Sequence, residues 1–203
     1  MPTQTFFNLQ SDKQNKILDV SKKEFSKYGF YEASINRIIK EAGISRGSFY
    51  QYFESKEDLF LYIIDNFKSV ITKLISEKLN DKKSDIFEFH LLIFDIITKN
   101  GFSGEDREFI VTTTSNINIK LVNHLLGFSP QKEISEELEE INKFINLDNI
   151  KYNTNEELIN IYTILMNATM YIIIIYFSNF NSYEGCRKDL INQFELIKYG
   201  ILK

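Results

Sequence analysis

The stretch from Ser34 to Lys56, SINRIIKEAGISRGSFYQYFESK, decides the fold of the first part of this chain. Gly43 can adopt the left-handed backbone conformation that ends a helix, and Ser45 can cap a new helix two residues later. A helix that begins so soon cannot fold back antiparallel to the first, so the two helices must cross steeply. Such a crossing is typical of a helix-turn-helix, whose second helix fits the major groove of duplex DNA, about 12 Å wide.

Capping residues and glycines predict about nine helices and no convincing strand, which makes the protein all-α. Ser11-Asp12-Lys13-Gln14 has the form of a capping box that opens the first helix, and Gly29 ends that helix. Two prolines and eight glycines in 203 residues leave little room for β-turns. The expected helices cover approximately residues 11–29, 34–43, 45–55, 55–79, 84–100, 103–126, 129–146, 154–179 and 182–202.

The composition describes a folded protein of a reducing compartment. Apolar residues make up 43% of the chain, enough for a packed core. The single cysteine, Cys186, excludes an internal disulfide framework. The first ten residues hold no basic cluster followed by an apolar run, so we expect no secretory signal and a cytoplasmic protein.

The charge is distributed unevenly around a net value of -4. Residues 1–56 hold nine Lys or Arg and six Asp or Glu, a net of +3, so the remainder sums to -7. A basic N-terminal part in an otherwise acidic protein suits a nucleic-acid binder, although an excess of three positive charges is also within ordinary surface variation. We therefore expect a DNA-binding domain over 1–56 and a second helical domain over 57–203, with 57–79 as a linking helix.

The second helix of the motif carries side chains that can read bases. Arg46 can donate a fork of hydrogen bonds to guanine, Gln51 can pair with adenine, and Ser48 is adaptable. Phe49 and Phe53 repeat at helical spacing and are expected to face inward. For Tyr50 and Tyr52, packing in the core in the same way is the alternative to contact with DNA. Residues expected to hold phosphates or to allow close approach are Ser34, Asn36, Gly47, Tyr50, Tyr52 and Lys56.

From Ile17 to Leu59 the chain closely resembles the tetracycline-repressor (TetR) family of bacterial transcription regulators. The resemblance covers about a fifth of the chain. Ser21 and Ile39 depart from it, since the family usually has small alanines at these two positions. The matching positions are Ile17-Leu18-Asp19-Val20, Phe25, Tyr28-Gly29-Phe30, Ser34-Ile35, Ile38, Glu41-Ala42-Gly43-Ile44-Ser45, Gly47, Phe49-Tyr50, Tyr52-Phe53 and Ser55-Lys56-Glu57-Asp58-Leu59.

The resemblance implies a homodimer that binds a palindromic, double-stranded DNA operator through the first three helices, with reading helices about 34–36 Å apart. It also implies a larger C-terminal domain that holds a small-molecule effector and releases the DNA. The nine DNA-contacting positions named above are consistent with the family's motif. The helix that reads the DNA bases is the most variable part of the family, so the resemblance does not tell which operator sequence this protein binds.

The last two predicted helices are candidates for dimerisation. Leu158 to Tyr183 is free of charged side chains over 26 residues, which invites a membrane-spanning interpretation. Asparagines spread through the stretch argue against a span, and burial against both the same chain and a partner explains the apolarity better. A monomeric core helix remains an alternative. The expected interface residues are Ile172, Ile175, Tyr176, Leu190, Phe194 and Ile197.

An effector site is less clearly marked. The polar run Thr112 to Asn116 lies beside apolar residues, and a mostly apolar pocket with a few hydroxyls and amides can orient a neutral or lipophilic molecule. The same residues also suit an ordinary core. The candidate lining residues are Phe67, His90, Phe94, Phe109, Thr113, Asn116 and Met170.

The leading hypothesis is therefore a ligand-responsive repressor. The alternatives are an effector-independent DNA-binding protein, either an activator or a chromosome-organising factor, and a membrane-associated helical protein. We expect no enzyme, cofactor or metal site, because the sequence has no acid–base pair on a recognisable frame, nucleophile motif, glycine-rich phosphate loop or metal-ligand spacing.

Overall fold

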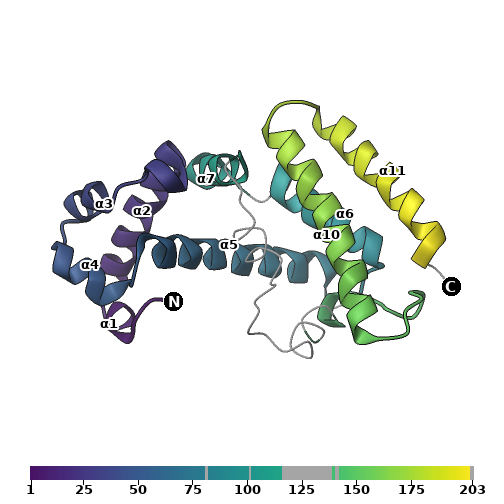
Figure 1. Cartoon of the computed structure of the whole chain (residues 1–203), viewed down its shortest axis with the longest axis horizontal. Coiled ribbons are helices and arrows are strands. Elements are labelled where there is room, and N and C mark those ends of the chain that lie inside the picture. Colours follow the sequence, from purple (N-terminus) through teal and green to yellow (C-terminus); the bar gives the residue numbers. More distant parts are fainter. Residues whose placement is uncertain (81, 101, 116–138, 140–141, 202–203) are drawn as a thin grey trace. The chain divides into compact units, whose positions relative to one another are not determined.

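The computed structural model describes residues 1–80, 82–100, 102–115, 139 and 142–201. Throughout these residues the chain is built from helices, as predicted, and the β-pairing there is one isolated parallel bridge between Ser84 and Ile145 (Figure 1). The chain forms two compact units, the first made of Met1–Ser69 and Ser103–Asn118, the second of Val70–Phe102 and Ile119–Lys203. The domain boundary expected at residue 56 stays a prediction.

The first unit has an aromatic core. Phe25, Phe49 and Phe53 are completely or almost completely buried, and the Phe25 ring meets that of Phe60 at 4.9 Å between centroids. Ser21, one of the departures from the family pattern, is also buried, and its hydroxyl donates to the Ile17 carbonyl at 2.6 Å. The elements of this unit are α1 (Gln4–Phe7), α2 (Ser11–Glu32), α3 (Ile35–Ala42), α4 (Arg46–Tyr52), the first part of α5 (Lys56–Leu79) and α7 (Gly104–Ser115).

The turn between α3 and α4 forms as its residues predict. Gly43 has φ 70° and ψ 36°, the left-handed conformation, and the backbone N–H groups of Gly43 and Ile44 both donate to the Ile39 carbonyl. The Ser45 hydroxyl then accepts the Ser48 backbone N–H at 3.0 Å and caps α4. The turn therefore depends on a residue without Cβ followed at once by a capping hydroxyl.

The start of α2 differs from the prediction. Gln10, rather than Ser11, occupies the N-cap position, and no side chain caps the helix there. The Gln14 amide donates to the carbonyls of Leu9 and Phe7, because the preceding residues already form the unpredicted helix α1. That helix is anchored by Phe6, which is buried and lies 4.8 Å from the Phe53 ring centroid.

The sequence predicts that the helix α2 ends at Gly29, but in the structure α2 has a kink at this residue. Gly29 has φ 68° and ψ 174°, so the backbone leaves the helical conformation there, and one further turn continues to Glu32.

The second unit packs α6 (Ile86–Asp95), the following π-helical turn η1 (Ile96–Asn100), α10 (Asn155–Phe177) and α11 (Tyr183–Ile201) against one another (Figure 1). Thr154 caps α10 as predicted, with its hydroxyl accepting from Glu157 N–H at 3.2 Å. The helix expected from about residue 84 begins at Ile86 with Asp85 as its N-cap, and the Ser84 backbone pairs with residues 144 and 146. The extension of the sixth predicted helix beyond Ser115 and most of the helix predicted over 129–146 lie outside the described residues.

Among the residues that the structure describes, one helix is long and apolar enough to cross a membrane by length and composition. It is α10, in which an 18-residue stretch has a mean hydropathy of 1.9 and is about one third buried inside the protein. A core helix of a soluble protein passes the same test, so this helix is weak evidence for a membrane span.

Candidate nucleic-acid interface

Helices α3 and α4 each divide into a buried and an exposed face. Ile38 and Ala42 of α3 and Phe49 of α4 are buried, which confirms the inward direction predicted for Phe49. Phe53, directly after α4, is buried as predicted as well. The polar side chains of both helices are thereby left at the surface of the helix-turn-helix.

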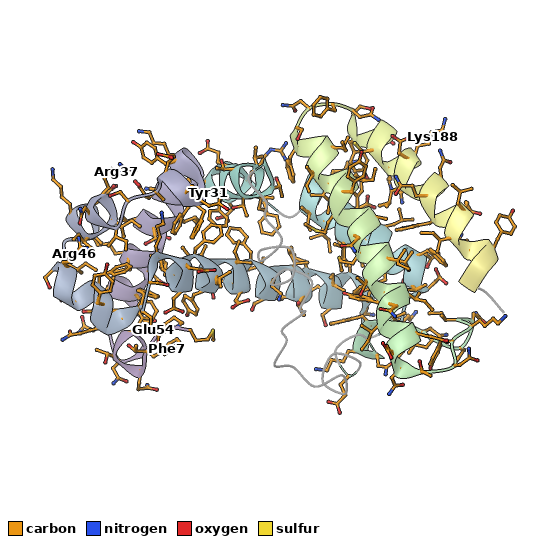
Figure 2. The ribbon with its side chains drawn as sticks, viewed as in Figure 1. Phe7, Tyr31, Arg37, Arg46, Glu54 and Lys188 are labelled. Atoms are coloured by element: carbon orange, nitrogen blue, oxygen red, sulfur yellow. The ribbon has the colours of Figure 1, made fainter. Side chains whose placement is uncertain are left out.

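Three of the predicted DNA-contacting residues are joined at the start of α4. The Arg46 guanidinium donates from Nη1 to Asn36 Oδ1 at 2.8 Å and lies 5.6 Å from the centre of the Tyr50 ring. Figure 2 labels Arg46. All three residues are exposed. An arginine held in this way has less conformational freedom to lose when it binds a base, and most of its five donors remain available.

The other residues of α4 fit around this group. Ser48 is half-buried, and its hydroxyl lies 2.9 Å from that of Ser45, while Gln51 is exposed. Around Gly47 the nearest atom to an added Cβ would be Ser45 Oγ at 3.8 Å. The fold itself therefore has room for a side chain at residue 47, so the packing of the protein alone does not require glycine there.

Tyr52 and Lys56 have structural contacts of their own. Tyr52 is only 5% exposed and packs against Phe6, so little of its surface is open to a phosphate. The Lys56 ammonium donates to the carbonyls of Tyr31 and Ala33 at 3.0 and 2.9 Å. DNA contacts by these two residues stay predictions.

A buried carboxylate that the sequence analysis did not single out organises the start of α3. Glu24 of α2 is 8% exposed, and its Oε1 accepts the Ser34 backbone N–H at 2.7 Å and Arg37 Nε at 2.8 Å. This hydrogen bond is the main reason why the pKa of Arg37 is raised. The guanidinium also lies 4.1 Å from the centre of the Tyr28 ring, at the surface of α3 (Figure 2).

Glu24 thus fixes the residue before α3, and Ser34, a predicted phosphate contact, is held by its backbone while its hydroxyl makes no capping bond. A glutamate next to a phenylalanine in a helix gives little hint that it is buried. Its partners lie 10 and 13 residues away, beyond the reach of helical spacing rules.

The predicted effector residues are divided between the two units. Phe67 and Phe109 stack at 5.0 Å in the first unit, where Thr113 is also buried. In the second unit His90 and Phe94 are completely buried and Met170 is half-buried. Asn116 lies outside the described residues. A single pocket lined by all of these residues stays a prediction.

The residues predicted for the dimer interface differ in their burial within the chain, and their role in a dimer stays a prediction. Ile172, Leu190 and Phe194 are buried within the chain itself, so their side chains have almost no surface to offer a partner. Ile175, Tyr176 and Ile197 remain partly exposed. The large apolar side chains that these two helices expose instead are Ile164, Tyr171, Leu196 and Tyr199.

Two family models match this chain. One, described as bacterial regulatory proteins of the tetR family, matches residues 17–63. The other, described as a tetracyclin repressor-like C-terminal domain, matches residues 85–201, more than half of the chain.

Individual proteins are similar to it as well. A Bacillus subtilis (strain 168) protein named "Uncharacterized HTH-type transcriptional regulator YdgC" is 38% identical over 100 residues, which are 48% of this chain and 50% of that protein. The match thus spans half the length of that relative. A solved structure assigned to the TetR-family transcriptional regulators, from Rhodococcus sp., has a TM-score of 0.63 at 14% identity and covers 93% of this chain and 99% of that one. A TetR-family transcriptional regulator from Pectobacterium atrosepticum has a TM-score of 0.55 at 13% identity, with 96% and 98% covered. At these identities the solved structures show a shared fold.

Proposed function

This chain belongs to the TetR family of bacterial regulatory proteins, and from that premise we propose that it is a repressor which binds a palindromic operator as a dimer and is released by a small molecule. Its relatives include a protein named as an HTH-type transcriptional regulator, and we propose that this protein also works on DNA in the cytoplasm. The proposed reading helix is α4, with Arg46, Ser48 and Gln51 directed to base edges. Asn36, Gly47 and Tyr50 would position the protein on the phosphate backbone or permit close approach.

The observation that carries this proposal is the exposed group of Arg46, Asn36 and Tyr50. Asn36 and Tyr50 hold Arg46 at the start of α4, and the opposite face of α4 is buried. The three exposed side chains therefore contribute nothing to the packing of the core. An exposed, pre-oriented arginine suits the two acceptors of guanine in the major groove. The room left around Gly47 supports close approach of the helix to the bases.

The experiment is to isolate the genomic fragments that the purified protein retains and then to measure affinity for one fragment at fixed salt. Arg46→Ala should lower that affinity by about 10- to 100-fold, because one bidentate base contact is worth about 1–3 kcal/mol. Tyr50→Ala should lower it less. Lys188→Ala removes the same charge from an exposed position of α11 in the second unit and serves as the matched control (Figure 2).

Normal affinity in both the Arg46 and Tyr50 variants would remove the proposal. Loss of affinity in Lys188→Ala as well would show that net charge, and not this group, determines binding.

We propose that the dimer forms through α10 and α11. Leu196 is 78% exposed and Tyr199 is 91% exposed, three residues apart and therefore on one face of α11, while Ile164 and Tyr171 are exposed one heptad apart on α10. Exposed apolar side chains gathered in this way are typical of an interaction surface. Leu196→Glu should shift the protein from dimer to monomer in sedimentation velocity, whereas Val70→Glu, at an exposed apolar residue of α5, should leave the dimer intact. A Leu196→Glu variant that sediments as a normal dimer would exclude this interface.

A further inference from the structure

His90 lies in the interior of the second unit. It belongs to α6 and is completely buried. Its ring centroid lies 5.2 Å from that of Tyr162 on α10 and 6.2 Å from that of Phe194 on α11. Because α6, α10 and α11 pack against one another, the imidazole sits where three helices meet.

One ring nitrogen of His90 is paired and the other is not. Nδ1 lies 2.8 Å from the Ile86 carbonyl oxygen. A carbonyl oxygen only accepts hydrogen bonds, so Nδ1 carries the proton and Nε2 is left as a bare acceptor. Nε2 is buried and has no hydrogen-bond partner in the described part of the chain.

Other buried polar groups of this unit are satisfied locally. The hydroxyls of Thr98 and Thr169 donate to the carbonyls four residues earlier, at 2.7 and 2.8 Å. Nearly all buried polar atoms in folded proteins have a partner, so an unpaired one calls for an explanation. Burial also lowers the pKa of His90 to about 4, so the ring is neutral at neutral pH and Nε2 accepts but does not donate.

We propose that Nε2 of His90 is the polar anchor of the effector site, and that the effector is a small uncharged molecule with an apolar body and one O–H or N–H group that donates to Nε2. This inference rests on the proposed function, since it names the class of molecule that would release the repressor. The surroundings favour an apolar body, because the rings of Phe89, Tyr162 and Phe194 lie 5.2–6.2 Å from the His90 ring between centroids. A carboxylate does not fit, since it also only accepts hydrogen bonds.

The test uses pairs of probes that differ in one donor: phenol and toluene, indole and indene, cyclohexanol and methylcyclohexane. Each probe is added to the purified protein with ¹⁵N-labelled histidine, in a His124→Gln background that leaves His90 as the single histidine of this sequence. We expect the Nε2 resonance to move upfield, as an accepted hydrogen bond requires, with at least one donor-bearing probe. That probe should bind about tenfold more tightly than its donor-free partner.

Two variants check the role of the nitrogen. His90→Phe replaces the ring by one of similar size without an acceptor, and should remove the preference for the donor while it keeps the affinity for the donor-free probe. In wild type the donor-bearing probe should weaken the binding of the captured DNA fragment, and in His90→Phe it should do so about tenfold less effectively.

The outcomes separate this inference from the proposed function. If the protein retains no DNA fragment, the proposed function fails whatever His90 binds. If DNA is bound but Nε2 is already hydrogen-bonded without a probe and responds to none, an internal water is its partner and this inference alone is wrong. Binding at His90 that leaves the DNA affinity unchanged also overturns the assignment of the effector site.

Discussion

The first unit buries the carboxylate of Glu24 and the second unit buries the imidazole of His90, and the two groups are hydrogen-bonded differently. In the first, the Glu24 carboxylate accepts from the Ser34 backbone and from Arg37, and so fixes α3 against α2. In the second, His90 has one hydrogen-bond partner and, within the residues that the structure describes, an unpaired acceptor. A satisfied group stabilises one geometry, whereas an unsatisfied buried acceptor gains free energy from any donor that reaches it. On the functions proposed above, the first region would present fixed side chains to DNA and the second would bind the effector.

The largest expected effect tests whether both regions are held by aromatic packing. Phe53→Ala in the first unit and Phe94→Ala in the second each remove a completely buried ring, and each should lower the free energy of unfolding by about 3–5 kcal/mol. Urea denaturation followed by circular dichroism measures the loss. Phe180→Ala, at a residue that is 80% exposed, should change it by less than about 0.5 kcal/mol. A much smaller loss for one buried phenylalanine would mean that its region does not depend on core packing.

The next effect is a pH dependence that belongs to the second unit. The pKa of His90 is about 4 in the folded protein and about 6.5 in an unfolded chain. Between these values the unfolded state binds a proton that the folded state does not, so stability falls as the pH falls. The loss contributed by His90 should reach about 3 kcal/mol at pH 4.

This loss is measured as the difference between wild type and His90→Phe in urea denaturation at several pH values. The variant should lack this component and keep at least wild-type stability at pH 7, because it no longer buries an unpaired acceptor. Parallel pH profiles of the two proteins would show that the imidazole is not held neutral by burial.

Glu24→Ala sharpens the comparison from the first unit. It removes the acceptor of the Ser34 N–H, while the half-exposed Arg37 can return to water. We therefore expect a loss of about 1–3 kcal/mol in stability and a weaker affinity for DNA. Glu24→Gln keeps an acceptor and should lose less on both measures. Glu105→Ala removes an exposed ion pair with Lys23 and should have almost no effect on stability. An unchanged DNA affinity in Glu24→Ala would mean that this carboxylate does not position α3.

The smallest effect compares two serines at N-cap positions. Ser45→Ala removes a capping hydrogen bond and should cost about 1 kcal/mol of stability. Ser34→Ala removes a hydroxyl that caps nothing, so its stability should change by less than about 0.5 kcal/mol, while its DNA affinity falls if the predicted phosphate contact exists. Thermal unfolding and fragment binding measure the two quantities. Equal stability losses in both variants would show that the hydroxyl at residue 34 also caps its helix.

Local turn chemistry was the part of the fold that sequence predicted well. Gly43 and Ser45 define the helix-turn-helix because a positive φ and a capping hydroxyl act within four residues. The same reasoning was wrong at Ser11, where Gln10 takes the N-cap position and the Gln14 amide donates to the carbonyls of Phe7 and Leu9. Capping depends on which partners the tertiary structure leaves available, and a pattern of four residues does not contain that information.

The candidate site shows the same division. The outward direction of Arg46 and Tyr50 followed from the helical period once Phe49 was assigned to the core. The pairing of Glu24 with Arg37 did not, because it joins different helices. The dimer residues predicted on α10 and α11 included three that the chain buries itself, since apolar periodicity marks a buried face without telling which molecule covers it.

The sequence by itself determined the family, the all-α class and the surface that α3 and α4 present, because each depends on neighbours within one or two helical turns. Only the tertiary structure decided that Glu24 is hydrogen-bonded and that Nε2 of His90 has no partner among the described residues. Hydrogen bonding of a buried atom depends on which distant helices close around it, and that is settled when the chain packs.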